Sequence, residues 1–248
     1  GGPGSLYRFM LDPELKTAVF ETEAPSTDFS RFYPASRIVR IRRGARSVTV
    51  LAGSTSFLFV QTPSISCRVK LCASFFSVAQ FSGETIEEED GSYRMRFETH
   101  ADYRLPLEPP PSSPVWAEMD HRKRARVKDQ LLVFDVTIRE VEHGVELSVG
   151  SAGCERVPVK LELILSSGTT IHGSEFVLPA SPGGSITVGD GEVTAESATD
   201  RVTIGPAFSE HWYAESMRGS EPQSQTGFTV YFTDYTPVAR TVTITTQS

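Results

Sequence analysis

The segment Thr241–Thr245 reads Thr-Val-Thr-Ile-Thr and alternates strictly between polar and apolar residues. A period of two is typical of a β-strand with one buried face, and it places Val242 and Ile244 together on that face. The segment Tyr93–Phe97 (Tyr-Arg-Met-Arg-Phe) alternates in the same way. No window of a dozen residues has a clear helical period, and the best helical candidate, 116–128, is mostly charged. These patterns predict an all-β protein.

Further short runs rich in Val, Ile, Thr, Phe and Tyr are separated by clusters of Gly, Pro and Ser, which is typical of strands joined by turns. Asp90-Gly91, between two such runs, is a two-residue hairpin signal. So many short strands predict a large antiparallel multi-strand sandwich of the supersandwich type, with few or no helices. We expect strands at 37–42, 47–52, 57–61, 66–76, 85–89, 93–99, 131–140, 145–149, 158–165, 174–178, 185–188, 192–196, 201–204, 228–233 and 241–245.

The domain organisation follows from composition. The opening Gly-Gly-Pro-Gly-Ser (1–5) is typical of the remnant of a cleaved expression tag, and we expect residues 6–248 to form one β-sandwich domain. The Pro-rich segment 106–114 is either a break between sub-domains or a stiff surface crossover; neither half has a boundary of its own, which favours the crossover. Hydrophobic residues at 39% and charged residues at 22% exclude wholesale disorder. No apolar run approaches the roughly 18 residues of a membrane helix, so no membrane partner is expected.

The net charge of −7 argues against a general nucleic-acid coat, yet the basic residues gather in two clusters. Six Arg lie between residues 31 and 46 with no acid among them, and a second cluster spans 121–128. The planar guanidinium donates two parallel hydrogen bonds to a carboxylate or sulfate, so one interpretation is a surface that binds a polyanion such as an acidic polysaccharide. The other interpretation, which the sequence favours, is that these residues pair with the acidic hairpin 84–90 or guard solvated strand edges. The candidate polyanion-binding residues are Arg40, Arg42, Arg43, Arg122, Arg124 and Arg126.

One segment carries the ingredients of acid–base catalysis. His211 and Tyr213 are two residues apart and would share a face on an extended strand, and Arg218 follows nearby. Polysaccharide lyases abstract a proton with Tyr or His and need a cation to stabilise the developing charge. These three residues are the catalytic candidates; the alternative is a His-capped turn with Trp and Tyr packed beneath it. The five His and three Cys match no metal-ligand spacing, so neither a metal nor another cofactor is expected.

An ordered set of sequence blocks resembles a known family. The set resembles the C-terminal β-sandwich region of heparinase II/III-like proteins, a group of bacterial polysaccharide lyases and their relatives. The blocks are 37–44 with 47–50, 103–107, 153–159 with 161–163, 204–206, 210–211, 217–220, and 228–233 with 235–237.

The resemblance implies an architecture and a function. In the family an α/α-toroid precedes the sandwich and supplies most catalytic residues, and a His-rich stretch at the start of the sandwich adds another His and, in some members, a zinc site. Neither feature is found in this chain, and His211 and Arg218 match family positions that we take to be structural. The resemblance therefore implies a non-catalytic sandwich domain that buttresses the toroid of a polysaccharide lyase and contacts acidic polysaccharide, in a periplasmic or secreted setting.

Other classes of function make different predictions. A protein that shares the sandwich but never was a lyase has the same sequence signals. A self-standing carbohydrate-binding module predicts a solvent-facing aromatic platform built from Trp116, or from Trp212 with Tyr213. A structural or partner-binding domain predicts a large exposed apolar face. A chain that is itself an active lyase needs His211 and Tyr213 to meet an Arg in a cleft.

Overall fold

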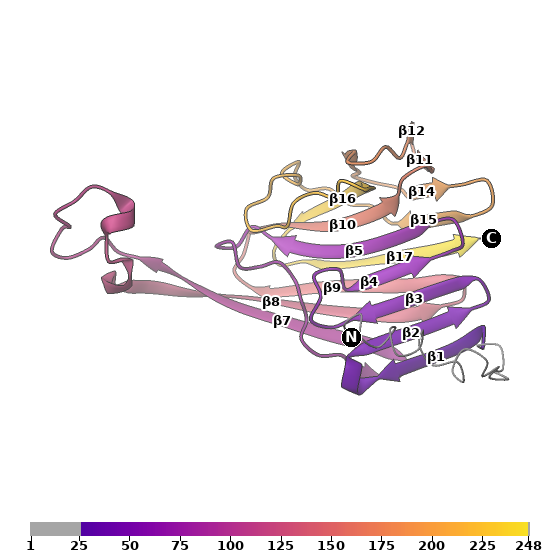
Figure 1. The fold of residues 1–248 in the computed structure, drawn as a ribbon, viewed down its shortest axis with the longest axis horizontal. Helices are drawn as coiled ribbons and strands as arrows, with labels where there is room; N and C mark the ends of the chain where they lie inside the picture. The colour runs from indigo at the N-terminus through magenta and orange to yellow at the C-terminus, as the bar shows by residue number, and fades with distance from the viewer. Residues whose placement is uncertain (1–25, 248) are drawn as a thin grey trace, which may run out of the picture.

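The computed structural model describes residues 26–247, and this part of the chain forms two large β-sheets packed face to face (Figure 1). Strands pair antiparallel throughout, except that β13 runs parallel to β16. Helical residues in the described part are confined to three short 3-10 turns. The prediction of an all-β antiparallel sandwich is confirmed. The expectation for residues 1–5 lies outside the described residues.

The strand order defines each sheet. The eight-stranded sheet runs β1 (Asp28–Tyr33), β2 (Ile38–Arg43), β3 (Arg46–Leu51), β4 (Leu58–Gln61), β5 (Ser66–Ala73), β10 (Pro158–Ser166), β16 (Gly227–Tyr235) and β13 (Ser185–Thr187). The nine-stranded sheet runs β12 (Val177–Pro179), β11 (Thr170–His172), β14 (Val193–Glu196), β15 (Arg201–Gly205), β17 (Ala239–Gln247), β9 (Gly144–Gly153), β8 (Arg126–Val141), β7 (Ser92–Arg104) and β6 (Glu87–Glu89). The 3-10 turns are η1 (Pro34–Ser36), η2 (Trp116–Glu118) and η3 (His121–Lys123).

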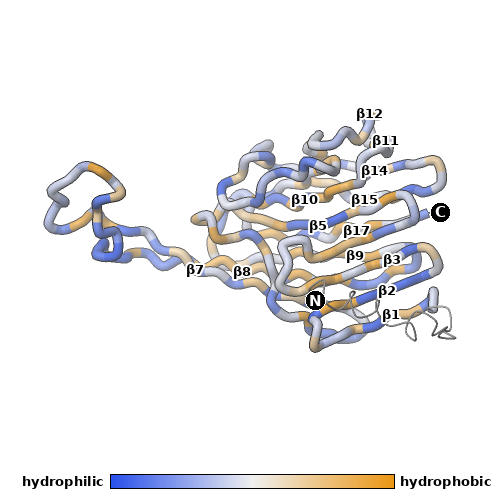
Figure 2. The backbone as a smooth tube through the Cα atoms, in the orientation of Figure 1, coloured by the Kyte–Doolittle hydropathy of each residue, from blue (hydrophilic) through white to orange (hydrophobic). Residues whose placement is uncertain are grey.

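The core lies between the two sheets and follows from the period-two pattern. Val242 and Ile244 of β17 are fully buried, as the alternation in 241–245 predicts. Phe81, in the connection between β5 and β6, joins the two layers: its ring lies 4.9 Å from that of Phe57 and 6.4 Å from that of Phe134 on β8. Figure 2 shows the alternation as short orange and pale or blue segments along the strands. Because side chains alternate between the two faces of a strand, every second residue points to the outer face of its sheet, away from the core.

The strands β7 and β8 extend beyond the sandwich as a two-stranded arm (Figure 1). Their pairing runs from Ser92↔Arg139 to Arg104↔Arg126 and is interrupted by one bulge. The tip of the arm holds η2, η3 and the Pro-rich segment 106–114, which therefore connects two hydrogen-bonded neighbours of one sheet. The best helical candidate of the sequence, 116–128, makes two 3-10 turns and then enters β8 at Arg126, in agreement with the prediction of few or no helices. The segment has no apolar stripe that would stabilise a longer helix.

Two strands were not expected, β1 and β11. β1 is an edge strand (Asp-Phe-Ser-Arg-Phe-Tyr) with no buried residue, so it carries a weak apolar signal, and β11 has only three residues. The turn at Asp90-Gly91 is confirmed between β6 and β7, with φ of 48° and 72° at the two residues. Positive φ at both positions suits the right-handed twist of a tight hairpin.

Candidate functional site

The outer face of the eight-stranded sheet carries a band of cationic and polar side chains. On β2, Val39 and Ile41 point into the core, so Arg40 and Arg42 point outward. The pairing registers extend this face across the sheet. One row reads Arg31, Arg40, Thr49, Phe59, Arg68, Ile164 and Thr229 from β1 to β16, and the row beside it reads Phe29, Arg42, Ser47, Gln61 and Ser66.

We call Arg31, Arg40, Arg42 and Arg68 the cationic face. Arg31 and Arg40 are direct cross-strand partners, and like charges in this position destabilise a sheet. Within residues 26–247, none of the four forms an ion pair with Asp or Glu; Arg40 donates to the Thr49 hydroxyl and Arg42 to the Gly44 carbonyl. The buried Nε of Arg68 has no hydrogen-bond partner there either. Glu221 lies near enough to Arg68 to interact with it electrostatically, but a group of four cations without direct ion pairs still attracts an anion with several charges.

A hollow of about 270 Å³ opens on the same face, at the ends of β4, β5 and β10. Phe59 and Ile164 give it an apolar floor, and Gln61, Ser66 and Arg68 give it hydrogen-bonding groups. Phe59 is half-buried, so part of its ring remains open to a ligand. An apolar floor with a few polar groups is the usual make-up of a ligand pocket.

The sequence cluster at 31–46 divides between two environments. Arg43 forms ion pairs with Asp28 (2.8 Å) and with Glu140 of β8 (2.7 Å), and Arg46 lies 3.5 Å from Glu140. These contacts tie the edge of one sheet to the other. Arg43 therefore fits the structural alternative, with Glu140 as its partner rather than the acidic hairpin 84–90, whereas Arg40 and Arg42 stay on the cationic face.

The second cluster lies at the tip of the arm, apart from the cationic face. Arg124 donates to the carbonyls of Leu105 and Arg104 (2.8 Å each), and its guanidinium carbon lies 5.7 Å from the Trp116 ring centroid. Arg124 therefore links the segment that leaves β7 to the segment that leads into β8. Arg126 forms an ion pair with Asp102 (3.2 Å). Arg122 is exposed and forms no ion pair with any described residue, and the Arg126 side chain is 71% exposed although its Nε is paired, so both remain accessible to a ligand.

His211, Tyr213 and Arg218 lie on the strap, residues 206–226, which connects β15 of one sheet to β16 of the other. The strap segment is not an extended strand, so His211 and Tyr213 do not share a face. His211 is buried, with its Nε2 3.1 Å from the carbonyl oxygen of Val159 and 3.0 Å from that of Asp234. Two carbonyl acceptors make this nitrogen a donor with a structural role.

Tyr213 and Arg218, by contrast, are brought together. The Tyr213 hydroxyl donates to the Ser216 carbonyl (2.9 Å) and accepts the backbone N–H of Arg218 (3.0 Å). No acid–base pair forms in this segment, because the imidazole of His211 is occupied inside the fold. Tyr213 instead fixes the turn that presents Arg218.

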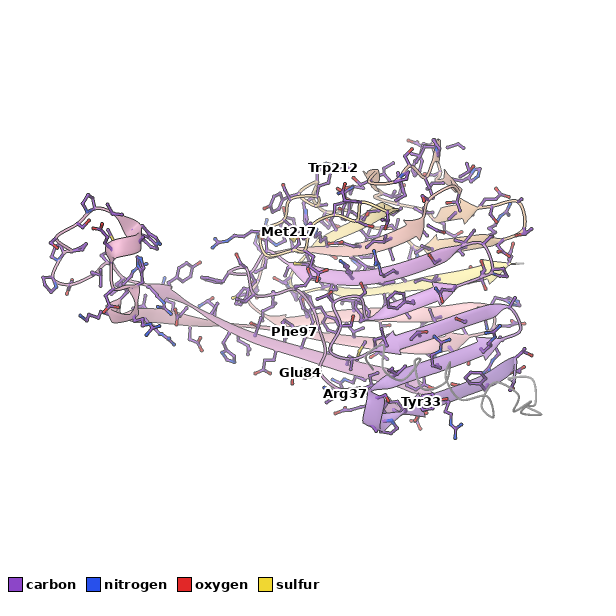
Figure 3. All side chains as sticks on the ribbon, in the orientation of Figure 1. Tyr33, Arg37, Glu84, Phe97, Trp212 and Met217 are labelled. Atoms are coloured by element: carbon purple, nitrogen blue, oxygen red, sulfur yellow. The ribbon has the colours of Figure 1, made fainter. Side chains whose placement is uncertain are left out.

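The exposed Trp side chains lie in different places. Trp116, 65% exposed, sits at the arm tip with its ring 3.9 Å from that of His121. Trp212, 79% exposed, lies on the strap, on the opposite side of the sandwich from Tyr33 of β1 (Figure 3). These residues do not form one platform. Two other rings lie beside the cationic residues: Phe59 is the cross-strand partner of Arg68, and the Tyr33 ring centroid lies 5.5 Å from the guanidinium carbon of Arg31. The sequence reasoning singled out neither ring.

The strap is anchored by charges on the outer face of β5 and β10. Lys160 and Glu162 form an ion pair (2.8 Å) with about 1% of each side chain exposed, and the Lys160 ammonium also donates to the Ala214 carbonyl (2.8 Å). Lys70 pairs with Glu221 at the far end of the strap, and this hydrogen bond holds the pKa of Glu221 below its usual value. Sequence reasoning missed these residues, although charged residues at every second position of an apolar strand were a visible signal.

Comparisons of the chain with protein-family models, with curated proteins and with solved structures gave no match. Among the described residues, no group of three or more His, Cys, Asp or Glu side chains could hold a metal ion. No helix in the part covered by the structure is long and apolar enough to span a bilayer. The structure therefore defines this chain as an all-β sandwich with a cationic outer face.

Proposed function

We propose that this chain is a non-catalytic β-sandwich domain of a heparinase II/III-like polysaccharide-degrading protein, and that it holds acidic polysaccharide on its cationic face. The observation that carries the proposal is the clustering of Arg31, Arg40, Arg42 and Arg68 on one face without acidic partners in residues 26–247. The sequence resemblance to heparinase II/III-like proteins supports the proposed kind of parent protein. It also suggests a second role for this domain, which is to support a helical toroid.

The dimensions of the face suit a polymer. Neighbouring strands are about 4.8 Å apart, so Arg40 on β2 and Arg68 on β5, three strand spacings apart, lie about 14 Å from one another. One small anion cannot contact both, whereas a chain with an anionic group on successive sugars can. Phe59 lies between them in the same row and offers an apolar surface to a sugar ring. The guanidinium groups would supply bidentate hydrogen bonds to carboxylate or sulfate.

Affinity chromatography and calorimetry test the proposal. We expect the protein to bind heparin or alginate with a salt-sensitive affinity, because exposed charges are screened over about 8 Å at physiological ionic strength. The pair Arg40→Ala and Arg42→Ala removes two charge-assisted contacts, each worth about 1.5 kcal/mol, so binding should weaken roughly a hundredfold.

The matched control is the pair Arg139→Ala and Arg201→Ala. Both of these Arg are exposed and belong to the nine-stranded sheet, where they pair with Glu146 and Glu196. The control changes net charge equally, so affinity should change little. If the two pairs of substitutions weaken binding equally, binding depends on net charge and not on the cationic face. If the unaltered protein binds neither polymer, the proposal is refuted.

A further inference from the structure

A second hollow, the arm-base cleft, opens where the arm leaves the sandwich and measures about 330 Å³. Five separate parts of the chain line it: the turn after β5, both strands of the arm, the β9–β10 turn and the strap. Ligand pockets measure about 300–1,000 Å³, so this cleft suits one or two sugar rings rather than a long segment of polymer.

One wall of the cleft is aromatic. Phe76 and Tyr103 meet edge to face with ring centroids 4.9 Å apart, and 54% of Tyr103 is exposed. Tyr103 follows the β7 bulge, and bulges redirect the side chains next to them. The wall therefore combines a large apolar surface with a phenolic hydroxyl that can hydrogen-bond.

A fixed cation faces this wall. The Arg218 Nε donates to the Ser77 hydroxyl (2.8 Å), and its backbone N–H donates to Tyr213. Gly219 lets the strap approach this closely, because a Cβ there would lie 2.5 Å from the Ser77 Cα. Arg218 forms no ion pair with any residue from 26 to 247. Its two terminal nitrogens are thus held at the cleft, with no acidic group of the described chain bound to them.

A carboxylate completes the set. Glu155 lines the cleft without pairing to Arg218 or to any other basic residue of the described chain. The chemistry is that of a sugar acid: an apolar ring face for Tyr103, a carboxylate for the Arg218 fork and hydroxyl donors for Glu155. A neutral sugar satisfies only part of this set, and a simple inorganic anion leaves Tyr103 and Glu155 unused.

We propose that the arm-base cleft binds a single uronic acid residue, such as the end of an acidic polysaccharide chain. The choice of ligand class rests on the proposed function; the location and the residues rest on the cleft itself. Arg218 and Tyr103 would decide affinity, and Glu155 would favour a sugar acid over a simple carboxylate.

Cys154 reports on occupancy, since it lines the cleft and is partly exposed, whereas the other two thiols are buried. The experiment follows alkylation of Cys154 by N-ethylmaleimide, resolved by peptide mass spectrometry, in the presence of sodium glucuronate, sodium acetate or glucose. We expect glucuronate to slow the reaction, with acetate and glucose having little effect. Glucuronate should bind about tenfold more weakly to the Arg218→Gln variant.

Two further variants guard the interpretation. Tyr103→Ala alters an exposed arm residue and should also reduce protection. Arg156→Gln is the control, because Arg156 is two residues from Cys154 but lies over the Tyr235 ring (5.6 Å) and does not line the cleft. Absence of protection by glucuronate, or equal protection by glucose, overturns the inference. If the protein still binds heparin or alginate in that case, the proposed function stands; loss of polymer binding as well refutes both.

Discussion

The buried pair Lys160–Glu162 offers a quantitative test of how the strap is held. The two side chains are about 1% exposed, their charged atoms lie 2.8 Å apart, and the ammonium also donates to the Ala214 carbonyl of the strap. Glu162→Gln leaves the ammonium without a counter-charge in the interior. Removing one partner of a buried pair costs about 3–5 kcal/mol, so the folded-to-unfolded ratio should fall by roughly a thousandfold.

The double variant Lys160→Met with Glu162→Leu should be far milder. It leaves no buried charge, and its main loss is the hydrogen bond to Ala214, worth about 1 kcal/mol. Urea unfolding followed by far-UV circular dichroism at pH 7 measures all variants. We expect each matching single variant (Lys160→Met, Glu162→Leu) to lose more stability than the double variant. A double-variant loss equal to the sum of these two single losses would refute a coupled buried pair.

Three further predictions concern the arm and the titratable groups. Replacing 105–125 by Asn-Gly should leave the melting temperature of the sandwich within a few degrees, because the tip packs on the arm; a large drop would contradict this. At pH 8 a thiol reagent should modify native Cys154 only, since burial raises the pKa of the other two thiols to about 12. Hydrogen bonds to Asp129 and then Glu98 raise the pKa of His100, so an NMR titration should give a value above 6.5 that falls in Asp129→Asn. The raised pKa implies stabilisation that is present below the unfolded pKa and is lost as pH rises through the folded value.

Much of the fold could be predicted from local pattern. Alternation in 241–245 placed Val242 and Ile244 in the core, and Asp90-Gly91 fixed one hairpin. The edge strand β1 was missed because an edge buries little and needs few apolar residues. The arm was also missed: its outer part pairs only with itself, so it shows no apolar face.

The candidate site depends on contacts that sequence distance hides. Arg40 and Arg42 follow from period two, but Arg68 joins them only through the registers of β3, β4 and β5. Arg43 is adjacent to Arg42 and points to the opposite side, where Glu140 neutralises it. The spacing of His211 and Tyr213 was informative only for an extended strand, and the strap is irregular there.

The location of bound polysaccharide tests the central claim most directly. Hydrogen–deuterium exchange with and without a heparin oligosaccharide, read by peptide mass spectrometry, reports where amides become protected. The proposal predicts slower exchange in peptides that cover 38–51 and 58–73, which carry most of the cationic face. Protection confined to the arm tip at 116–128, or no protection at all, would contradict it.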